Sequence, residues 1–149
     1  MAIPAVYLVI IRNEEILLSR RANTGYEDGK YGLVSGHVEA GESLRQAIVR
    51  EAKEEIGLDI PIEAVDLAMT VSRFAPKSTP PERLDFFMRV AHWTGEPINV
   101  EPHKCSELRW FHLNDLPDTT IEYIKHALQQ ITLGCHFCEV GWQYSALTT

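Results

Sequence analysis

The stretch GHVEAGESLRQAIVREAKEEIGL, residues 36–58, limits most strongly how this chain can fold. Ser43 and Gln46 have the spacing of a capping box, in which each side chain bonds the backbone N–H of the other residue. Gly57 can adopt the left-handed conformation that commonly ends a helix. These two signals predict a helix over residues 44–56. Apolar residues recur between them at helical spacing, which predicts that one face of this helix is buried.

Three carboxylates share another face of the same helix. Glu51, Glu54 and Glu55 stand at i, i+3 and i+4, so their side chains are neighbours. Like charges at this spacing repel by roughly 0.2–0.5 kcal/mol per pair, and the helix dipole disfavours anions near the C-terminal end. Arg50 and Lys53 offset part of that cost. The spacing alone allows two interpretations, a hard divalent cation held by carboxylate oxygens or a solvated acidic face.

The complete stretch matches the pattern G-x5-E-x7-R-E-U-x-E-E-x-G-U without a gap, where U is apolar. By this pattern, which is the Nudix box, the chain resembles the Nudix hydrolase family of MutT-like pyrophosphohydrolases. Less specific motifs, W-x-G-E-P and E-L-x-W-F, extend the resemblance over most of the sequence. The resemblance implies an α/β fold, a Nudix α/β/α sandwich with a mixed β-sheet between helices. A single domain should span residues 1–149, with the box at 36–58.

The resemblance also implies a reaction. Water should attack phosphorus in a nucleoside diphosphate linked to another moiety, such as a nucleoside triphosphate or a nucleotide sugar, and break the phosphoanhydride bond. Mg²⁺, or Mn²⁺ in its place, would lower the pKa of bound water and neutralise phosphate oxygens. The alternative is a catalytically silent Nudix-like module that senses a nucleotide. Such a module would be expected to lose a ligand, whereas this chain keeps the whole pattern.

By resemblance, each residue of the box has an expected role. Glu51 and Glu55 should be the principal metal ligands, with Glu54 completing the cluster. The backbone carbonyl at Gly36 should add a further oxygen ligand. Arg50 should orient the glutamates through its planar guanidinium group.

The general base should be a glutamate, either within the box or outside it. Within the box, Glu54 and Glu55 are the candidates. Alignment on the W-x-G-E-P turn places Glu101 at the outer position, although an exposed loop acid is the alternative interpretation. Glu82 and Glu107 are further candidates.

A polar loop and its borders supply candidate substrate ligands. Arg20, Arg21 and Lys30 are expected to neutralise substrate phosphate, unless this segment is a solvated connection. Residues 116–120 lack the asparagine that recognises the base in MutT-like oxidised-guanine triphosphatases. That absence counts against 8-oxo-dGTP as the main substrate.

Composition narrows the partners and the compartment. A net charge of -7 argues against a nucleic-acid polymer, which normally needs a basic surface. The longest apolar run, residues 3–11, is too short to span a bilayer, so we expect no membrane partner. Three cysteines, an odd number, suggest reduced thiols in a cytoplasmic protein. The resemblance allows a homodimer, and the sequence predicts a small-molecule nucleotide substrate.

The remaining elements follow from apolar alternation and turn residues. A capping box at Thr119 and Glu122 should begin a second helix that ends near Gly134. The tail, residues 135–144, should be a late or edge strand. The other expected strands are residues 5–11, a returning strand at 15–19, and strands at 32–38, 64–74, 84–92 and 108–112.

Overall fold

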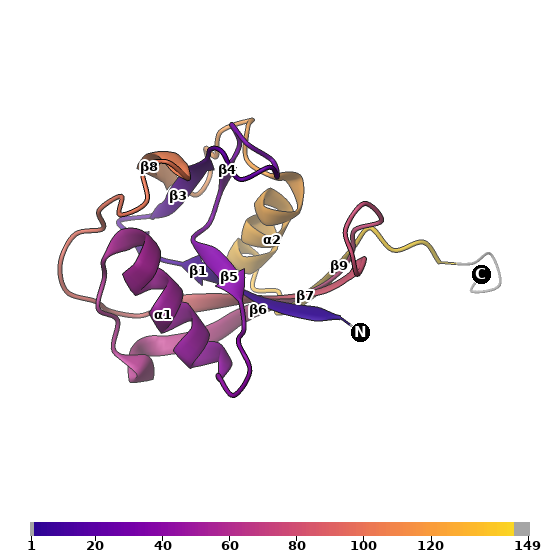
Figure 1. Cartoon of the computed structure of the whole chain (residues 1–149), viewed down its shortest axis with the longest axis horizontal. Coiled ribbons are helices and arrows are strands. Elements are labelled where there is room, and N and C mark those ends of the chain that lie inside the picture. Colours follow the sequence, from indigo (N-terminus) through magenta and orange to yellow (C-terminus); the bar gives the residue numbers. More distant parts are fainter. Residues whose placement is uncertain (1, 145–149) are drawn as a thin grey trace.

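The computed structural model describes residues 2–144. They form nine strands, two α-helices and one short 3-10 helix (Figure 1). The elements are β1 (Ile3–Val9), β2 (Ile11–Arg12), β3 (Glu15–Arg21), β4 (Tyr31–Gly32), β5 (Ser35–His37), α1 (Leu44–Ile56), η1 (Ile62–Ala64), β6 (Val65–Phe74), β7 (Glu82–Val90), β8 (Cys105–His112), α2 (Glu122–Thr132) and β9 (Phe137–Val140).

A five-stranded mixed sheet forms the centre of the molecule, in the order β5-β1-β7-β6-β9. β1 runs parallel to β7 and antiparallel to β5, so Ala5 lies opposite Asp85 on one side and His37 on the other. β6 and β7 form a long antiparallel pair, and β9 adds to β6 in parallel as an edge strand. The prediction of an edge strand in the tail is therefore confirmed.

The alternation of side chains along β1 explains the two helical layers. Val6 and Leu8 belong to the buried cluster that includes Ile48 of α1. Tyr7 and Val9 belong to the other buried cluster, which includes several residues of α2. Because successive strand residues point to opposite faces, α1 and α2 cover opposite sides of the sheet, as Figure 1 shows. The predicted α/β/α sandwich with a mixed sheet is confirmed.

A second, smaller sheet was not predicted. β3 pairs antiparallel with β2 and β4, and with β8. The sequence suggested that residues 5–11 and 15–19 pair as a hairpin. The chain instead passes from one sheet to the other at the fully buried Ile10, and only the short β2 pairs with β3. The expected strand at 32–38 is likewise divided between the two sheets, as β4 and β5.

The start of the second helix also differs from the prediction. Its N-cap is Ile121, which makes no side-chain cap, and the proposed capping box at Thr119 and Glu122 is wrong. The hydroxyl of Thr120 donates to the carbonyl oxygen of Pro117 at 2.7 Å, so a turn precedes the helix. No helix within residues 2–144 is long and apolar enough to cross a membrane.

Candidate active site

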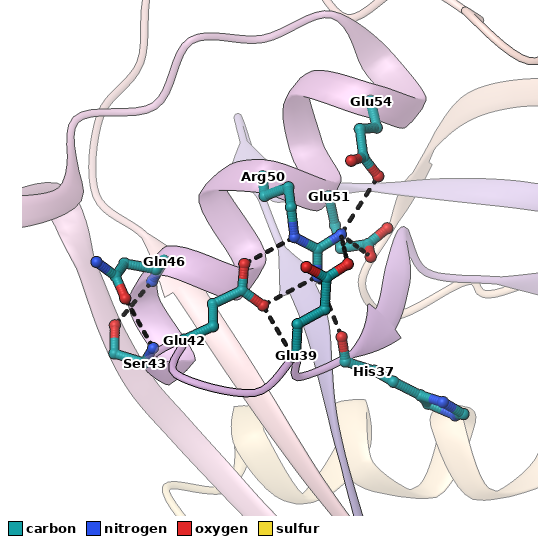
Figure 2. A network of polar contacts seen from close by, with 8 residues as sticks. All are labelled: His37, Glu39, Glu42, Ser43, Gln46, Arg50, Glu51 and Glu54. Carbon is teal, nitrogen blue, oxygen red and sulfur yellow. Dashed lines mark hydrogen bonds and ion pairs between the residues drawn. The ribbon is translucent and has the colours of Figure 1, made fainter.

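Helix α1 has the limits and the caps that its sequence predicts. The backbone N–H of Gln46 donates to Ser43 Oγ at 3.1 Å, and that of Ser43 donates to Gln46 Oε1 at 2.8 Å (Figure 2). Gly57 has φ +69°, the left-handed conformation expected of a helix stop. Ile48 and Ile56 are buried in the core. The caps and the buried face together fix the side of the helix on which its carboxylates lie.

Arg50 holds these carboxylates together. Its Nε and Nη2 donate to the two oxygens of Glu42 at 2.7 and 3.0 Å, which is a bidentate pair. Its Nη1 donates to Glu51 at 2.7 Å and to Glu54 at 3.3 Å. Nη2 also donates to the carbonyl oxygen of His37 at 3.1 Å, while the imidazole points away from the network in Figure 2. Arg50 thus contacts the carboxylates of Glu42, Glu51 and Glu54.

Glu42 anchors the loop before the helix. The backbone N–H of Glu39 donates to Glu42 Oε1 at 3.0 Å, on the oxygen that also accepts from Arg50. The hydrogen bonds from Arg50, and then that from the Glu39 backbone, hold the pKa of Glu42 below its usual value. The same pairing raises the pKa of Arg50, with Glu42 as the largest cause. Glu42 is therefore ionised at neutral pH, and its hydrogen bonds connect this loop to Arg50 of α1.

Gly36 and Glu51 are in close contact. A Cβ atom placed on Gly36 would lie 2.1 Å from Glu51 Oε1, a distance that real Cβ atoms essentially never show. Glu51 reaches its position beside β5 only because residue 36 has no side chain. The glycine that opens the box is therefore a steric requirement of the carboxylate fifteen positions later in the same motif.

Glu55 is a partly buried carboxylate of the box, and its surroundings disfavour the charged form. Burial, and then the neighbouring Glu51 and Glu101, raise its pKa to about 9, against a lowering contribution from the Ser35 backbone. Its Oε2 is buried and has no hydrogen-bond partner among residues 2–144. A buried carboxyl oxygen without a partner costs free energy, and such groups recur at functional sites.

The loop between β7 and β8 brings Glu101 to the same place. The last carbonyls of a helix have no partner within it. Here Ile98 N–H donates to the carbonyl of Ile56 at 3.0 Å, and Val100 N–H donates to that of Glu55 at 3.2 Å. The loop is thereby fastened to the C-terminal end of α1, and the Glu101 carboxylate acts on the pKa of Glu55. Glu101 therefore lies in a loop, with its side chain one-third exposed, and lines the same cavity as Glu54 and Glu55.

The other candidate acids lie elsewhere. Glu107 accepts a hydrogen bond from the Tyr31 hydroxyl, which connects β8 to β4. Glu82 begins β7, where it lies opposite Phe74. Neither residue lines the cavities described below.

Two cavities meet at the box. One, of about 480 Å³, is lined by Glu54, Glu55 and Glu101 among others. The other, of about 670 Å³, extends over the central sheet. Both are lined by Arg21, Ser35, Gly36 and Glu51.

Of the three predicted substrate ligands, the structure brings one to these cavities. Arg21 lines both, and its Nε donates to the carbonyl of Tyr26 at 2.7 Å. Arg20 instead donates to the carbonyl of Gly29 at 3.0 Å. Lys30 pairs with Glu27 at 2.8 Å. Arg20 and Lys30 line neither cavity.

The donor set has the chemistry that a hard divalent cation requires. Glu51, Glu54, Glu55 and Glu101 line one cavity beside the Gly36 backbone, and all of them offer oxygen ligands. Among the described residues, no three acidic, histidine or cysteine side chains already stand around one point at which they could hold an ion. Glu51 and Glu54 are instead held by Arg50. Ion binding would therefore require the side chains of Glu51 and Glu54 to rotate. The buried Oε2 of Glu55, which lacks a hydrogen-bond partner, is a candidate ligand for such an ion.

The larger cavity has polar residues that the sequence analysis missed. Asp85 is fully buried and accepts from Tyr7 at 3.1 Å and from Arg73 at 2.7 Å. Arg73 also lies over the ring of Tyr123, 3.8 Å from its centroid. A carboxylate inside an otherwise apolar strand, LDFFM, was the signal that could have identified this cluster.

Comparisons with known proteins agree with this geometry. The family model described as "NUDIX domain" matches residues 1–131. NAD-capped RNA hydrolase NudC of Stutzerimonas stutzeri (strain A1501) is 32% identical over 115 residues, which cover 76% of this chain and 38% of that protein. The same-named protein of Pseudomonas aeruginosa (strain LESB58) is 32% identical over 114 residues, 76% of this chain and 37% of the relative. The chain thus matches well under half the length of these relatives.

Solved structures give the same result. The MutT NUDIX hydrolase from Burkholderia pseudomallei superposes with a TM-score of 0.77 at 28% identity, covering 87% of this chain and 98% of the other. The MutT protein from Methanosarcina mazei Go1 superposes with a TM-score of 0.75, covering 89% and 94%. At 23% identity, that second likeness concerns the fold alone.

Proposed function

Because this chain belongs to the Nudix family, we propose that it is a Mg²⁺-dependent pyrophosphohydrolase, with Mn²⁺ as a substitute ion. The substrate would be a nucleoside diphosphate linked to another moiety, such as a nucleoside triphosphate or a nucleotide sugar. The observation that carries the proposal is the buried, unpartnered carboxyl oxygen of Glu55 beside Glu51 and Glu101. A carboxylate in that position is stabilised by a bound cation, whereas a purely structural helix would gain by replacing it.

In this proposal Glu51, Glu55 and the backbone carbonyl at Gly36 hold the ion, and Glu54 joins them. When bound, the ion supplies charge neutralisation for phosphate oxygens and lowers the pKa of bound water. Arg50 keeps Glu51 and Glu54 in position through the hydrogen bonds described above. Arg21, which lines both cavities, would bind a phosphate oxygen of the substrate.

Glu101 is the proposed general base, with Glu54 and Glu55 as the alternatives inside the box. The base takes a proton from water as the water oxygen bonds to phosphorus and the bridging oxygen of the phosphoanhydride leaves. The two products are phosphate-bearing fragments. Glu101 lines the smaller cavity and its side chain is one-third exposed, so water can reach it.

The comparisons suggest further candidate substrates. The relatives are named as NAD-capped RNA hydrolases, so a free NAD-like dinucleotide joins the candidates for this chain. A net charge of -7 favours a free nucleotide over RNA. The three cysteines form no disulfide, which is consistent with a cytoplasmic protein, and a homodimer is one proposed assembly.

The test is a substrate panel. Nucleoside triphosphates, ADP-ribose, nucleotide sugars, dinucleoside polyphosphates and NAD⁺ would be incubated with the protein and Mg²⁺, and the products separated by chromatography. We expect metal-dependent release of two phosphate-bearing products from at least one compound, and its loss in Glu55→Gln. Binding of a nucleotide without turnover of any compound would support the silent sensing module instead.

A further inference from the structure

The larger cavity carries an arginine that the proposed hydrolysis does not use. Arg83, near the start of β7, lines this cavity together with Arg21 and Arg73. Its Nε is buried and has no hydrogen-bond partner, and among the described residues it forms no ion pair. A guanidinium donor withdrawn from water without an acceptor costs free energy, and such a group needs a reason to be there.

The strand register makes this arginine more costly still. Arg83 lies directly opposite Arg73 in the β6–β7 pair. Like charges directly opposite each other across two strands are destabilising. Arg73 is compensated, because its Nε donates to Asp85 at 2.7 Å, and Asp85 accepts from Tyr7 as well. Arg83 therefore remains as the uncompensated cation of the pair.

Arg83 lies at a distance from the box, where the proposed function places the diphosphate of the substrate. His37, the second residue of the box, lies opposite Ala5, which in turn lies opposite Asp85, two residues from Arg83. Two strand spacings and two residues along β7 give about 12 Å between the backbones of His37 and Arg83. That span is much longer than the separation of two adjacent phosphates. It suits a nucleoside between two anionic groups.

We propose that Arg83 binds a second phosphate group of the substrate, a phosphomonoester remote from the bond that is cleaved. This inference rests on the proposed function, which assigns binding of the cleaved diphosphate to the box. Arg73, Asp85 and Tyr7 form the fixed polar wall of the cavity, and Arg83 supplies the free donors. Arg83 is then a specificity-determining residue, which favours nucleotides that carry an additional phosphate on the nucleoside.

The first experiment tests the anion site without any turnover. Inorganic phosphate would be titrated into the metal-free protein while the arginine Nε–H signals are followed by NMR, with chloride at matched ionic strength as control. The Arg83 signal, assigned from its loss in Arg83→Gln, should shift and saturate. The signal of Arg89, an exposed arginine on the same strand, should not. No saturable shift at Arg83, or an equal shift at Arg89, overturns the proposal.

The second experiment tests the substrate class with matched pairs, NADP⁺ against NAD⁺ and coenzyme A against 3′-dephospho-coenzyme A. With Mg²⁺, kcat/KM should favour the phosphorylated member of at least one pair by about 10–100-fold, as loss of a hydrogen bond to a charged group implies. Arg83→Gln should reduce that preference to within about threefold, and Arg89→Gln should keep it. Equal rates within both pairs, or a preference that survives Arg83→Gln, overturns the proposal.

The outcomes distinguish this inference from the proposed function. Turnover of the broader panel with none of these four compounds cleaved overturns the substrate class alone. No turnover of any compound overturns the proposed function, and the phosphate titration then decides the anion site by itself. Arg83→Gln should unfold at no lower temperature than the wild type, because it removes a repulsion with Arg73. A lower unfolding temperature for Arg83→Gln would contradict the claim that the positive charge of Arg83 is uncompensated in the folded protein.

Discussion

The contact between Gly36 and Glu51 allows a sharp test of the site, the substitution Gly36→Ala. The new methyl group would stand 2.1 Å from Glu51 Oε1 and 2.3 Å from its carboxyl carbon. Since ordinary van der Waals contacts begin at 3.4 Å, the carboxylate must move by about 1 Å or more. Gly36 is not among the glycines with positive φ, so alanine can adopt its backbone conformation.

The expected effect is large on activity and small on stability. A displacement of about 1 Å at a catalytic group costs on the order of 10² in rate, and we expect kcat/KM to fall by about that factor. The variant also loses the 2.7 Å hydrogen bond between Arg50 and Glu51, worth about 1–2 kcal/mol of unfolding free energy. Steady-state kinetics at saturating Mg²⁺ and urea unfolding would measure the two effects.

Gly32→Ala is the matched control. It too adds one methyl group to a strand glycine, but that group would meet the flexible ends of Ile121 and Ile124 at 3.2 and 3.4 Å. Its kcat/KM should stay near that of the wild type. If folded Gly36→Ala keeps kcat/KM within about threefold of the wild type, or if both variants lose activity equally, the steric argument is refuted.

Three further predictions concern the same helix. Because the pKa of Glu55 is about 9 in the folded protein, above that of the unfolded chain, the folded state holds an extra proton between about pH 4.5 and pH 9. The unfolding free energy of the metal-free protein should therefore fall with rising pH in that window, by at most about 1.4 kcal/mol per pH unit, and urea titrations of Glu55→Gln should lack this contribution. Mg²⁺ should release a proton on binding at pH 7, which calorimetry in buffers of different ionisation enthalpy would detect; an enthalpy independent of the buffer would contradict it. Ser43→Ala should lower the unfolding free energy, measured with urea, by about 1 kcal/mol because the helix loses its cap. Its kcat should be retained at temperatures where the protein is folded. An unchanged urea midpoint would refute the role of the cap.

The sequence predicted α1 and its charged face well, because these depend on neighbours within a few positions. Ser43, Gln46 and Gly57 determine the helix ends through contacts between residues close in the chain, so the sequence alone indicates them. The prediction at Thr119 failed because a second local possibility, a turn closed by Thr120 onto Pro117, was equally available. Local patterns identify candidates for a cap, and packing decides between them.

The second sheet and the larger cavity were harder to predict, because both depend on long-range pairing. β3 pairs with β8 across more than half the length of the chain, and no local pattern predicts that register. Arg73, Arg83 and Asp85 form one cluster only when β6 and β7 pair in their observed register. The outer glutamate, Glu101, could be proposed from a resemblance, but its attachment to the end of α1 needed the structure.

The pairing of β1 with strands on both of its sides limits the order in which the molecule can assemble. This first strand pairs with β5 and with β7. Ile3 can therefore form its strand pair only after the chain has been synthesised as far as Arg83. Pairing over such a long loop is slow, since chain entropy is lost before the contacts form. During synthesis, α1 leaves the ribosome before β7, which completes the sheet that α1 covers. Until then, the helical conformation of α1 is favoured only by local interactions such as its caps. All residues of the box are therefore synthesised well before the sheet that positions them can form.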